Sequence, residues 1–180
     1  MPFAWKDDKL KNMLEKSYNF EEPGLLSVVA VGVPGKRTFF LVIGEKENWI
    51  RLWLEKEHLE AVSIAIDQFF VRLSQEFPLF SEETATRSSG DDSPVGLPSG
   101  EFEIDQVGIG FDKEKVVFEF MVHALGPQNL DGISVNCWIN PERVRKLGKQ
   151  AKEICAAGRP RCKLCGRPID PMGHDCPMQN

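Results

Sequence analysis

The sequence predicts an α+β fold made of two successive βββα units, followed by a short tail rich in cysteine. Twice along the chain, segments rich in β-branched and aromatic residues give way to a stretch with helical spacing of apolar residues. The two strand-to-helix junctions are also alike: Trp53-Leu54-Glu55-Lys56-Glu57 aligns with Trp138-Ile139-Asn140-Pro141-Glu142, and Val31-Gly32-Val33 aligns with Ile109-Gly110-Phe111. We therefore expect an internal duplication, in which antiparallel sheets are covered by helices and share a core about a pseudo-twofold axis.

The composition is that of an ordinary soluble protein, with 42% hydrophobic and 27% charged residues. No apolar run reaches about 18 residues, so we expect no membrane-spanning helix. The N-terminus, Met1-Pro2-Phe3-Ala4-Trp5-Lys6, lacks the basic and apolar regions of a signal peptide. Four of the five cysteines lie in the last 26 residues, whereas a secreted disulfide scaffold would spread them more evenly. These features predict a cytoplasmic protein.

Residues 1–20 are expected to form an N-terminal helical segment. Leu10, Met13, Leu14 and Tyr18 follow helical spacing among many charged residues. Glu22-Pro23-Gly24 then ends the helix.

Residues 21–80 make up the first predicted unit. Its strands are expected at 25–33, 37–43 and 48–54, with Pro34-Gly35 as the first turn. From Glu55 onward the apolar residues recur at helical spacing, and Pro78 ends the helix.

Residues 81–100 are polar and rich in Gly, Ser and Pro, which predicts a flexible linker or long loop. The second unit, residues 101–158, has strands expected at 102–111, 115–125 and 133–139. Asn140 is a good N-cap, Pro141 suits the first helical position, and Gly158 is a plausible end of the helix.

The tail, residues 159–180, carries the strongest chemical signal. Two residues separate Cys162 from Cys165, and one separates His174 from Cys176, so three thiols and an imidazole lie within fifteen positions. Such ligands can surround zinc tetrahedrally, and four protein ligands leave no position for water or substrate. We therefore predict a structural Zn²⁺ ion held in a zinc ribbon or knuckle.

Two glycines, Gly166 and Gly173, fit the tight turns that this ligand spacing needs. A redox pair at Cys162 and Cys165 is a weaker interpretation, because such pairs begin a helix after a strand, whereas this pair follows a helix and precedes Pro168. A catalytic zinc with a water ligand is disfavoured for the same reason that favours a structural one: four protein ligands are present.

The net charge of −5 is unevenly distributed. Residues 141–180 contain nine Lys or Arg against four Asp or Glu, so this end is basic while the rest is strongly acidic. The asymmetry is compatible with an anionic partner, but we favour the simpler interpretation, a solvated helix face whose charges offset a zinc–thiolate cluster. The candidate contacts are Arg143, Arg145, Lys146, Lys149, Lys152, Arg159, Arg161, Lys163 and Arg167.

Residues typical of catalytic sites are scarce. The chain has three histidines and lacks the Gly-x-Ser-x-Gly motif of many serine hydrolases. We expect His58 to be exposed at a helix start, and His123 to be a structural residue of a strand. An enzyme site would have to form between the two units, and its candidate residues are Lys36, Arg37, Glu57, Glu142 and His123.

Four segments resemble the DUF3090 family of uncharacterised bacterial proteins, which occurs largely in actinobacteria. They are residues 35–40, 54–57 and 108–112 and, most specifically, residues 157–177 with the Cys-x-x-Cys and His-x-Cys pairs. The resemblance covers roughly residues 20–178. It implies a soluble cytoplasmic protein and brings no established activity.

The sequence therefore favours an uncharacterised zinc-binding protein that acts as a non-catalytic binding or adaptor protein for a protein partner. One alternative is an enzyme with a site between the two units. Another is a nucleic-acid binder that uses the basic last helix and the tail, although the tail has no aromatic residue on which a base could stack. No membrane partner is expected, and the oligomeric state stays open.

Overall fold

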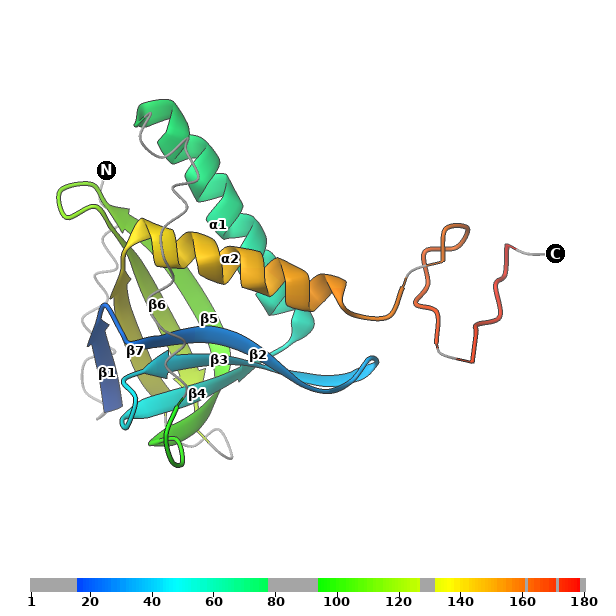
Figure 1. Cartoon of the computed structure of the whole chain (residues 1–180), viewed down its shortest axis with the longest axis horizontal. Coiled ribbons are helices and arrows are strands. Elements are labelled where there is room, and N and C mark those ends of the chain that lie inside the picture. Colours follow the sequence, from blue (N-terminus) through cyan, green and yellow to red (C-terminus); the bar gives the residue numbers. More distant parts are fainter. Residues whose placement is uncertain (1–15, 78–93, 127–131, 161, 171, 179–180) are drawn as a thin grey trace.

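The computed structural model describes residues 16–77, 94–126, 132–160, 162–170 and 172–178. Within these residues the chain forms one seven-stranded sheet and two helices, so it is α+β as predicted (Figure 1). The elements are β1 (Lys16–Glu21), β2 (Leu25–Val33), β3 (Lys36–Gly44), β4 (Trp49–Leu54), α1 (Lys56–Glu76), β5 (Gly100–Asp112), β6 (Val117–Leu125), β7 (Gly132–Ile139) and α2 (Pro141–Ala156).

The sheet is mixed, with the strand order β1-β7-β6-β5-β4-β3-β2. The pairs β1/β7 and β4/β5 are parallel, and the other neighbouring pairs are antiparallel. The prediction of an antiparallel sheet is therefore wrong. Parallel neighbours need a long crossover connection, and the chain reaches β5 from β4 through α1 and the segment that follows it.

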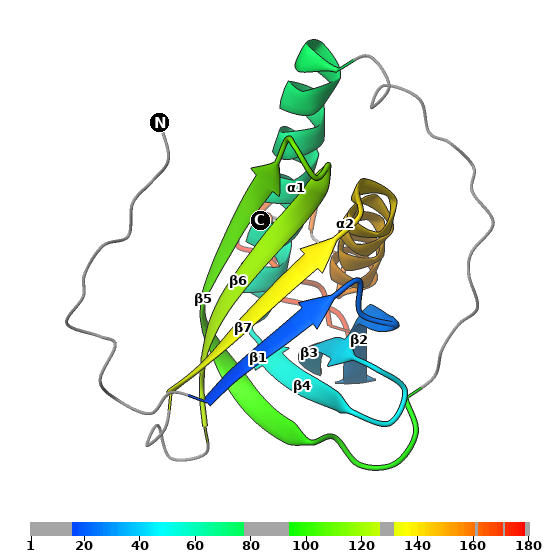
Figure 2. The ribbon, with the colours of Figure 1, turned by 90° about the vertical axis from the view of Figure 1, so that its left-hand side faces the viewer.

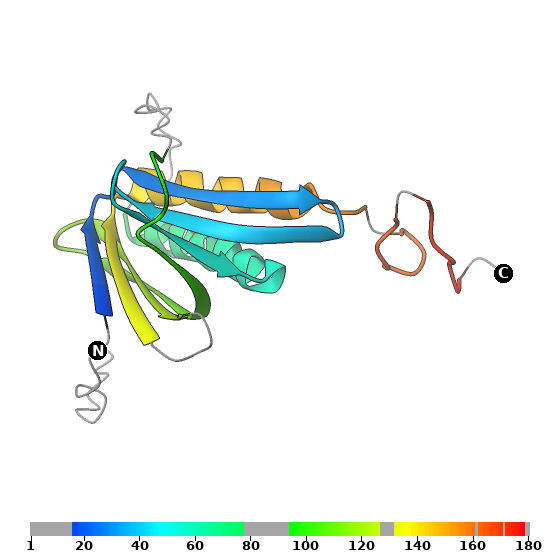
Figure 3. The same cartoon turned by 90° about the horizontal axis from the view of Figure 1, so that it is seen from below.

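The order of elements along the chain is βββα twice, first β2-β3-β4-α1 and then β5-β6-β7-α2. The two groups form adjoining halves of one sheet, because the last strand of the first group lies beside the first strand of the second. Equivalent strands of the two groups, such as β4 and β7, are therefore not neighbours in the sheet, and the internal duplication with its pseudo-twofold axis stays a prediction. Both helices lie on the same side of the sheet, where they contact each other (Figure 3).

A three-residue link forces the sheet to curl. β1 and β2 are joined by residues 22–24 alone, yet they form opposite edges of the sheet. In a flat sheet, six strand spacings would separate these edges by about 29 Å, whereas four Cα steps reach at most about 15 Å. The sheet therefore bends until β1 returns towards β2 (Figure 2). The rings of Tyr18 in β1 and Phe102 in β5 accordingly meet, with centroids 5.9 Å apart.

The start of α2 holds this link in place. Glu22 has a φ of +48°, a left-handed conformation that costs a non-glycine residue roughly 1 kcal/mol. Asn140 Nδ2 donates to the Glu22 carboxylate at 2.9 Å, and Arg143 donates to the carbonyl oxygen of Gly24 at 3.2 Å. Pro23 between them is fully buried. The N-terminus of α2 and the link thus fix each other.

The predicted N-terminal helix is wrong where it overlaps β1. Residues 16–20 belong to a strand, while residues 1–15 lie outside the described residues. Tyr18 and Phe20 are partly buried and pair with the buried Val135 and Cys137 of β7, whereas Ser17 and Asn19 are exposed. This alternation has the period of a strand. Pairing with β7, which is distant in the sequence, stabilises the strand over the predicted helix.

Part of the predicted linker is attached to the sheet. Residues 81–93 lie outside the described residues, but residues 95–99 contact the loop before β4 and the first residue of this strand. The Val95 amide donates to Lys46 O at 2.9 Å, the Trp49 indole donates to Val95 O at 3.2 Å, and the Ser99 amide donates to Trp49 O at 2.7 Å. β5 begins directly afterwards, at Gly100.

The core lies between the two helices and the sheet, and a glycine sets the distance between the helices. A Cβ built on Gly148 of α2 would lie 2.8 Å from Cγ2 of Ile66 in α1, and Ile66 is 1% exposed. The helices can approach this closely only because Gly148 has no side chain. Around this contact pack the other buried helix residues, Leu59, Phe70 and Leu73 of α1 and Val144, Leu147 and Ala151 of α2.

We expect Gly148→Val to lower the free energy of unfolding by about 1–3 kcal/mol, because the added carbons overpack the contact with Ile66. Urea unfolding followed by circular dichroism measures the change. Valine has a higher helix propensity than glycine, so propensity would not cause this loss. Lys149→Val, at an exposed neighbouring position, is the control for a valine that lacks the contact with Ile66. Equal destabilisation by the two variants would contradict the packing argument.

Candidate metal centre

The tail after α2 is built from two turns that the sequence predicts. In the first, the Gly166 amide donates to Cys162 O at 2.9 Å, and the Cys162 amide donates to Arg167 O at 2.8 Å. In the second, the Gly173 amide donates to Asp170 O at 2.8 Å. Gly166 and Gly173 have φ values of +72° and +93°, so both glycines take the left-handed conformation expected of them.

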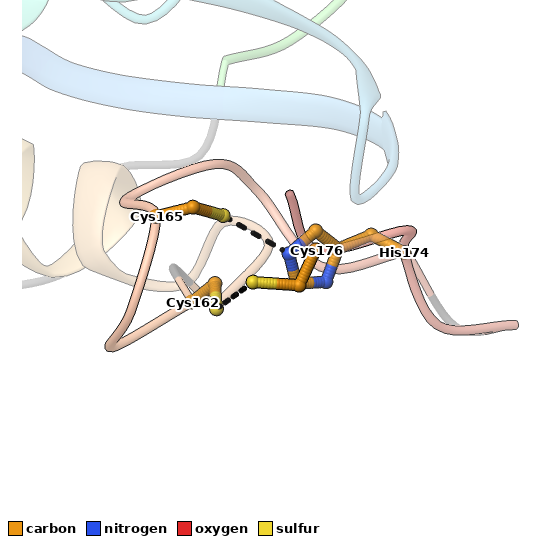
Figure 4. Close-up of side chains that lie close together, drawn as sticks. All are labelled: Cys162, Cys165, His174 and Cys176. Atoms are coloured by element: carbon orange, nitrogen blue, oxygen red, sulfur yellow. Dashed lines mark hydrogen bonds between the residues drawn. The ribbon is translucent and has the colours of Figure 1, made fainter. Parts of the chain in front are cut away.

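The two turns bring together the four predicted metal ligands (Figure 4). One ligand atom each from Cys162, Cys165, His174 and Cys176 can be chosen so that all lie within 4.8 Å of one another. The Sγ atoms of Cys162 and Cys176 are 3.8 Å apart, and Cys165 Sγ lies 3.2 Å from His174 Nε2. These residues therefore lie close enough to bind a metal ion.

The donor set and spacing fit zinc. Four bonds of about 2.3 Å in a tetrahedron place two sulfurs about 3.8 Å apart, which is the separation of Cys162 and Cys176. Thiolate and imidazole are the ligands that zinc prefers in structural sites. Four such ligands would fill a tetrahedral shell around a bound zinc ion.

The electrostatics of the turn favour the metal-binding form of one thiol. The backbone amides of Cys165 and Leu164 lower the pKa of the Cys162 thiol to about 6, and the Leu164 amide lies 3.4 Å from its sulfur. Loss of hydration raises the pKa of Cys176 instead. Since the thiolate is the ligand form, the lowered pKa favours metal binding by Cys162 over Cys176.

The base of the tail is attached to the β2–β3 hairpin. Arg159 forms an ion pair with Asp170, and the Ile169 amide donates to Pro160 O at 2.7 Å. The Arg159 side chain also lies against the hairpin turn, since a Cβ on Gly35 would be 3.1 Å from Arg159 Nε. Beyond this contact the tail projects away from the sheet and the helices (Figure 1).

Several basic residues proposed for an anionic partner have partners within the chain. Arg143 contacts the β1–β2 link, Lys152 pairs with Asp67 of α1, and Arg159 pairs with Asp170. The Arg145 guanidinium lies 4.2 Å from the ring centroid of Phe70. The remaining candidates are the exposed Lys146, Lys149, Lys163 and Arg167, and Arg161, which lies outside the described residues. The basic charge of α2 therefore serves the fold in large part.

The two glutamates considered for an enzyme site lie far apart, and the other candidates come from different elements. Lys36 and Arg37 begin β3, Glu142 begins α2, and His123 lies in β6. Glu57 lies near Cys155, in the last turn of α2, whereas Glu142 lies in the first turn of the same helix. The helix is about 24 Å long, so most of its length separates the two glutamates. His123 Nδ1 is 3.1 Å from an Asp105 carboxylate oxygen. Asp105 was not among the sequence candidates, because no local motif marks it.

The family resemblance is confirmed by a family model described as "Protein of unknown function (DUF3090)", which matches residues 18–176. The chain belongs to this family. The matched range contains all four candidate ligands. No curated protein and no solved structure matches the chain. In the described part of this DUF3090 protein, neither helix is long and apolar enough to cross a membrane.

We expect the purified protein to contain one metal ion per chain and Cys162→Ser to lose it, because a three-ligand shell binds far more weakly. Mass-spectrometric elemental analysis measures the metal, and visible absorption after cobalt substitution reports tetrahedral thiolate coordination. Cys155→Ser, on α2 and outside the cluster, is the matched control. Metal content that is unchanged in Cys162→Ser would refute the ligand assignment.

We expect Arg143→Gln to lower the free energy of unfolding by about 1–2 kcal/mol, because it removes the charged contact with the β1–β2 link. Lys146→Gln, on the same helix but exposed, should change it by less than about 0.5 kcal/mol. Chemical denaturation of the metal-loaded proteins measures the free energy of unfolding of both variants. Equal stability of both variants would argue that Arg143 has no structural role.

Proposed function

We propose that this DUF3090 protein is a non-catalytic binding or adaptor protein, whose tail is ordered by one structural Zn²⁺ ion and contacts a protein partner. The observation that carries the proposal is a four-ligand cluster in a projecting tail whose turns expose apolar side chains. Leu164 is 59% exposed and Met172 is 98% exposed. An exposed apolar side chain on an ordered turn is a ready contact for another protein.

The assignment of zinc is supported by the ligand chemistry. Three thiolates and one imidazole suit zinc, and the cation would leave the site with a net charge of −1. The tail also needs such a centre, because none of its described residues from Arg159 to Met178 is fully buried. A segment without a core takes its folding energy from the metal. The two turns and the absence of strands in the described tail favour a knuckle over a ribbon.

The character of the partner is indicated by the residues around the turns. Leu164 lies between the first two ligands, and Met172 lies two residues before His174. Methionine adapts to irregular surfaces because its side chain is unbranched and polarisable. Lys163 and Arg167 are exposed beside them. We propose a protein partner that offers an apolar surface with acidic groups at its rim.

The alternatives have less support. A nucleic-acid interface would need the basic residues of α2 and the tail, but Arg143, Lys152 and Arg159 have acidic or carbonyl partners within the chain. An enzyme would need its catalytic groups to meet, and Glu57 and Glu142 are at opposite ends of α2. We also infer a reducing cytoplasm, since zinc binding requires free thiols.

A duplication of the βββα unit is part of the same proposal. The element order repeats, and Trp53 and Trp138 each occupy the second-last position of the strand before a helix. Both side chains keep some solvent exposure. The tandem arrangement would follow from copying a unit end to end, with α1 becoming the crossover between the copies.

We expect a partner captured from the native cell by the zinc-loaded protein to bind Leu164→Asp or Met172→Asp at least about tenfold more weakly, a loss of about 1.4 kcal/mol. Calorimetry with the purified partner measures the affinity, and elemental analysis should show unchanged metal. Leu97→Asp is the control, because Leu97 is 89% exposed but lies in the loop before β5. Removal of the metal with a chelator should also weaken binding. A partner that binds all variants equally would contradict the role of the tail.

A further inference from the structure

A cavity of about 310 Å³ lies between α1 and β5, and none of its lining residues belongs to the tail. Its apolar wall from α1 consists of Ala61, Val62, Ala65 and Phe69. β5 contributes three more apolar residues, which are Ile104, Val107 and Ile109. A volume of 310 Å³ is at the small end of the range for ligand pockets. A site of this size suits a small molecule.

The cavity exists because α1 presents small side chains to β5. Ala61 and Ala65 are four residues apart, so they lie on the same face of the helix. Leu59, Ile66 and Phe70 are buried in the core instead. A leucine at position 65 would extend into the space that the alanine methyl group leaves open.

One end of the cavity is polar. Exposed His58 and Asp105 line it together with the apolar residues. Asp105 is an extra residue in β5, because the pairing with β6 shifts between Ile104 and Gln106. Such bulges redirect a side chain and often lie beside binding sites. Here the bulged residue both borders the cavity and contacts His123 across the strand pair, at 3.1 Å.

The contact with His123 leaves Asp105 able to accept further hydrogen bonds. An ionised carboxylate has two oxygens and about four acceptor positions. His123 contacts Oδ2. A carboxylate beside an apolar wall favours a ligand whose head group donates hydrogen bonds, and it disfavours an anionic head group.

We infer that this cavity binds a small molecule with a short apolar body and a head group that donates hydrogen bonds to Asp105. The shared chemistry is that of an alcohol or an amine on a short apolar chain. This site is independent of the metal centre and of the partner contact proposed for the tail.

The test compares three probes that share a chain and differ in their head groups: octylamine, octanol and octanoate. Titrations of the full-length, zinc-loaded protein are followed by amide chemical shifts of α1 and β5. We expect saturable binding of octylamine or octanol, and at least tenfold weaker binding of octanoate. A preference for octylamine identifies a cationic head group, and equal binding of octylamine and octanol identifies a neutral donor. Octanoate binding as tightly as both would overturn the inference.

Two kinds of variant locate the site. Ala65→Leu fills the cavity and should weaken binding of the better probe at least tenfold, whereas Glu60→Leu, at an exposed position on another face of the same helix, should leave it unchanged. Ala61→Leu replaces Ala65→Leu if the latter does not fold. Asp105→Asn should reduce the discrimination against octanoate. Unchanged binding in the filled variants would show that the probes bind elsewhere and would overturn the proposal.

Discussion

The three-residue link between β1 and β2 is the constraint on which the rest of the structure depends. It joins the two edges of a seven-stranded sheet, so the sheet must curl and close its apolar face around Tyr18 and Phe102. Asn140 and Arg143 bind the link and thereby position the start of α2. The direction of α2 then decides where the chain leaves the fold, and its far end delivers the tail beside the β2–β3 hairpin.

α1 joins the two halves of the sheet and also creates the cavity. It carries the chain between the parallel strands β4 and β5, because parallel neighbours cannot be connected by a tight turn. Its contact with α2 is close where Ile66 meets Gly148, while Ala61 and Ala65 leave space beside β5. The same helix thus packs tightly along one face and loosely along another, and the loose face borders the bulge at Asp105.

The metal centre was predictable from the sequence because it is local. Its four ligands lie within fifteen residues, and Gly166 and Gly173 mark the turns that bring them together. The roles of the basic residues were not predictable in this way. Arg143 lies in an amphipathic helix like Lys146, and only the folded chain shows that Arg143 reaches Gly24, which is 119 positions away. Asp105 was missed for the same reason. His58 was expected to be exposed at a helix start, as it is, but nothing in the sequence connects it with Asp105.

The sequence by itself determined the segments from β2 to α2 and the set of metal ligands. Strand alternation, helical spacing, Pro34-Gly35, the Asn140 cap and the Cys/His spacing all act between near neighbours. The tertiary structure alone decided that residues 16–20 form a strand, that β4 lies parallel to β5, and that a cavity remains beside α1. These features arise from contacts between distant segments, and the energy of such contacts overrides local preference when the core closes.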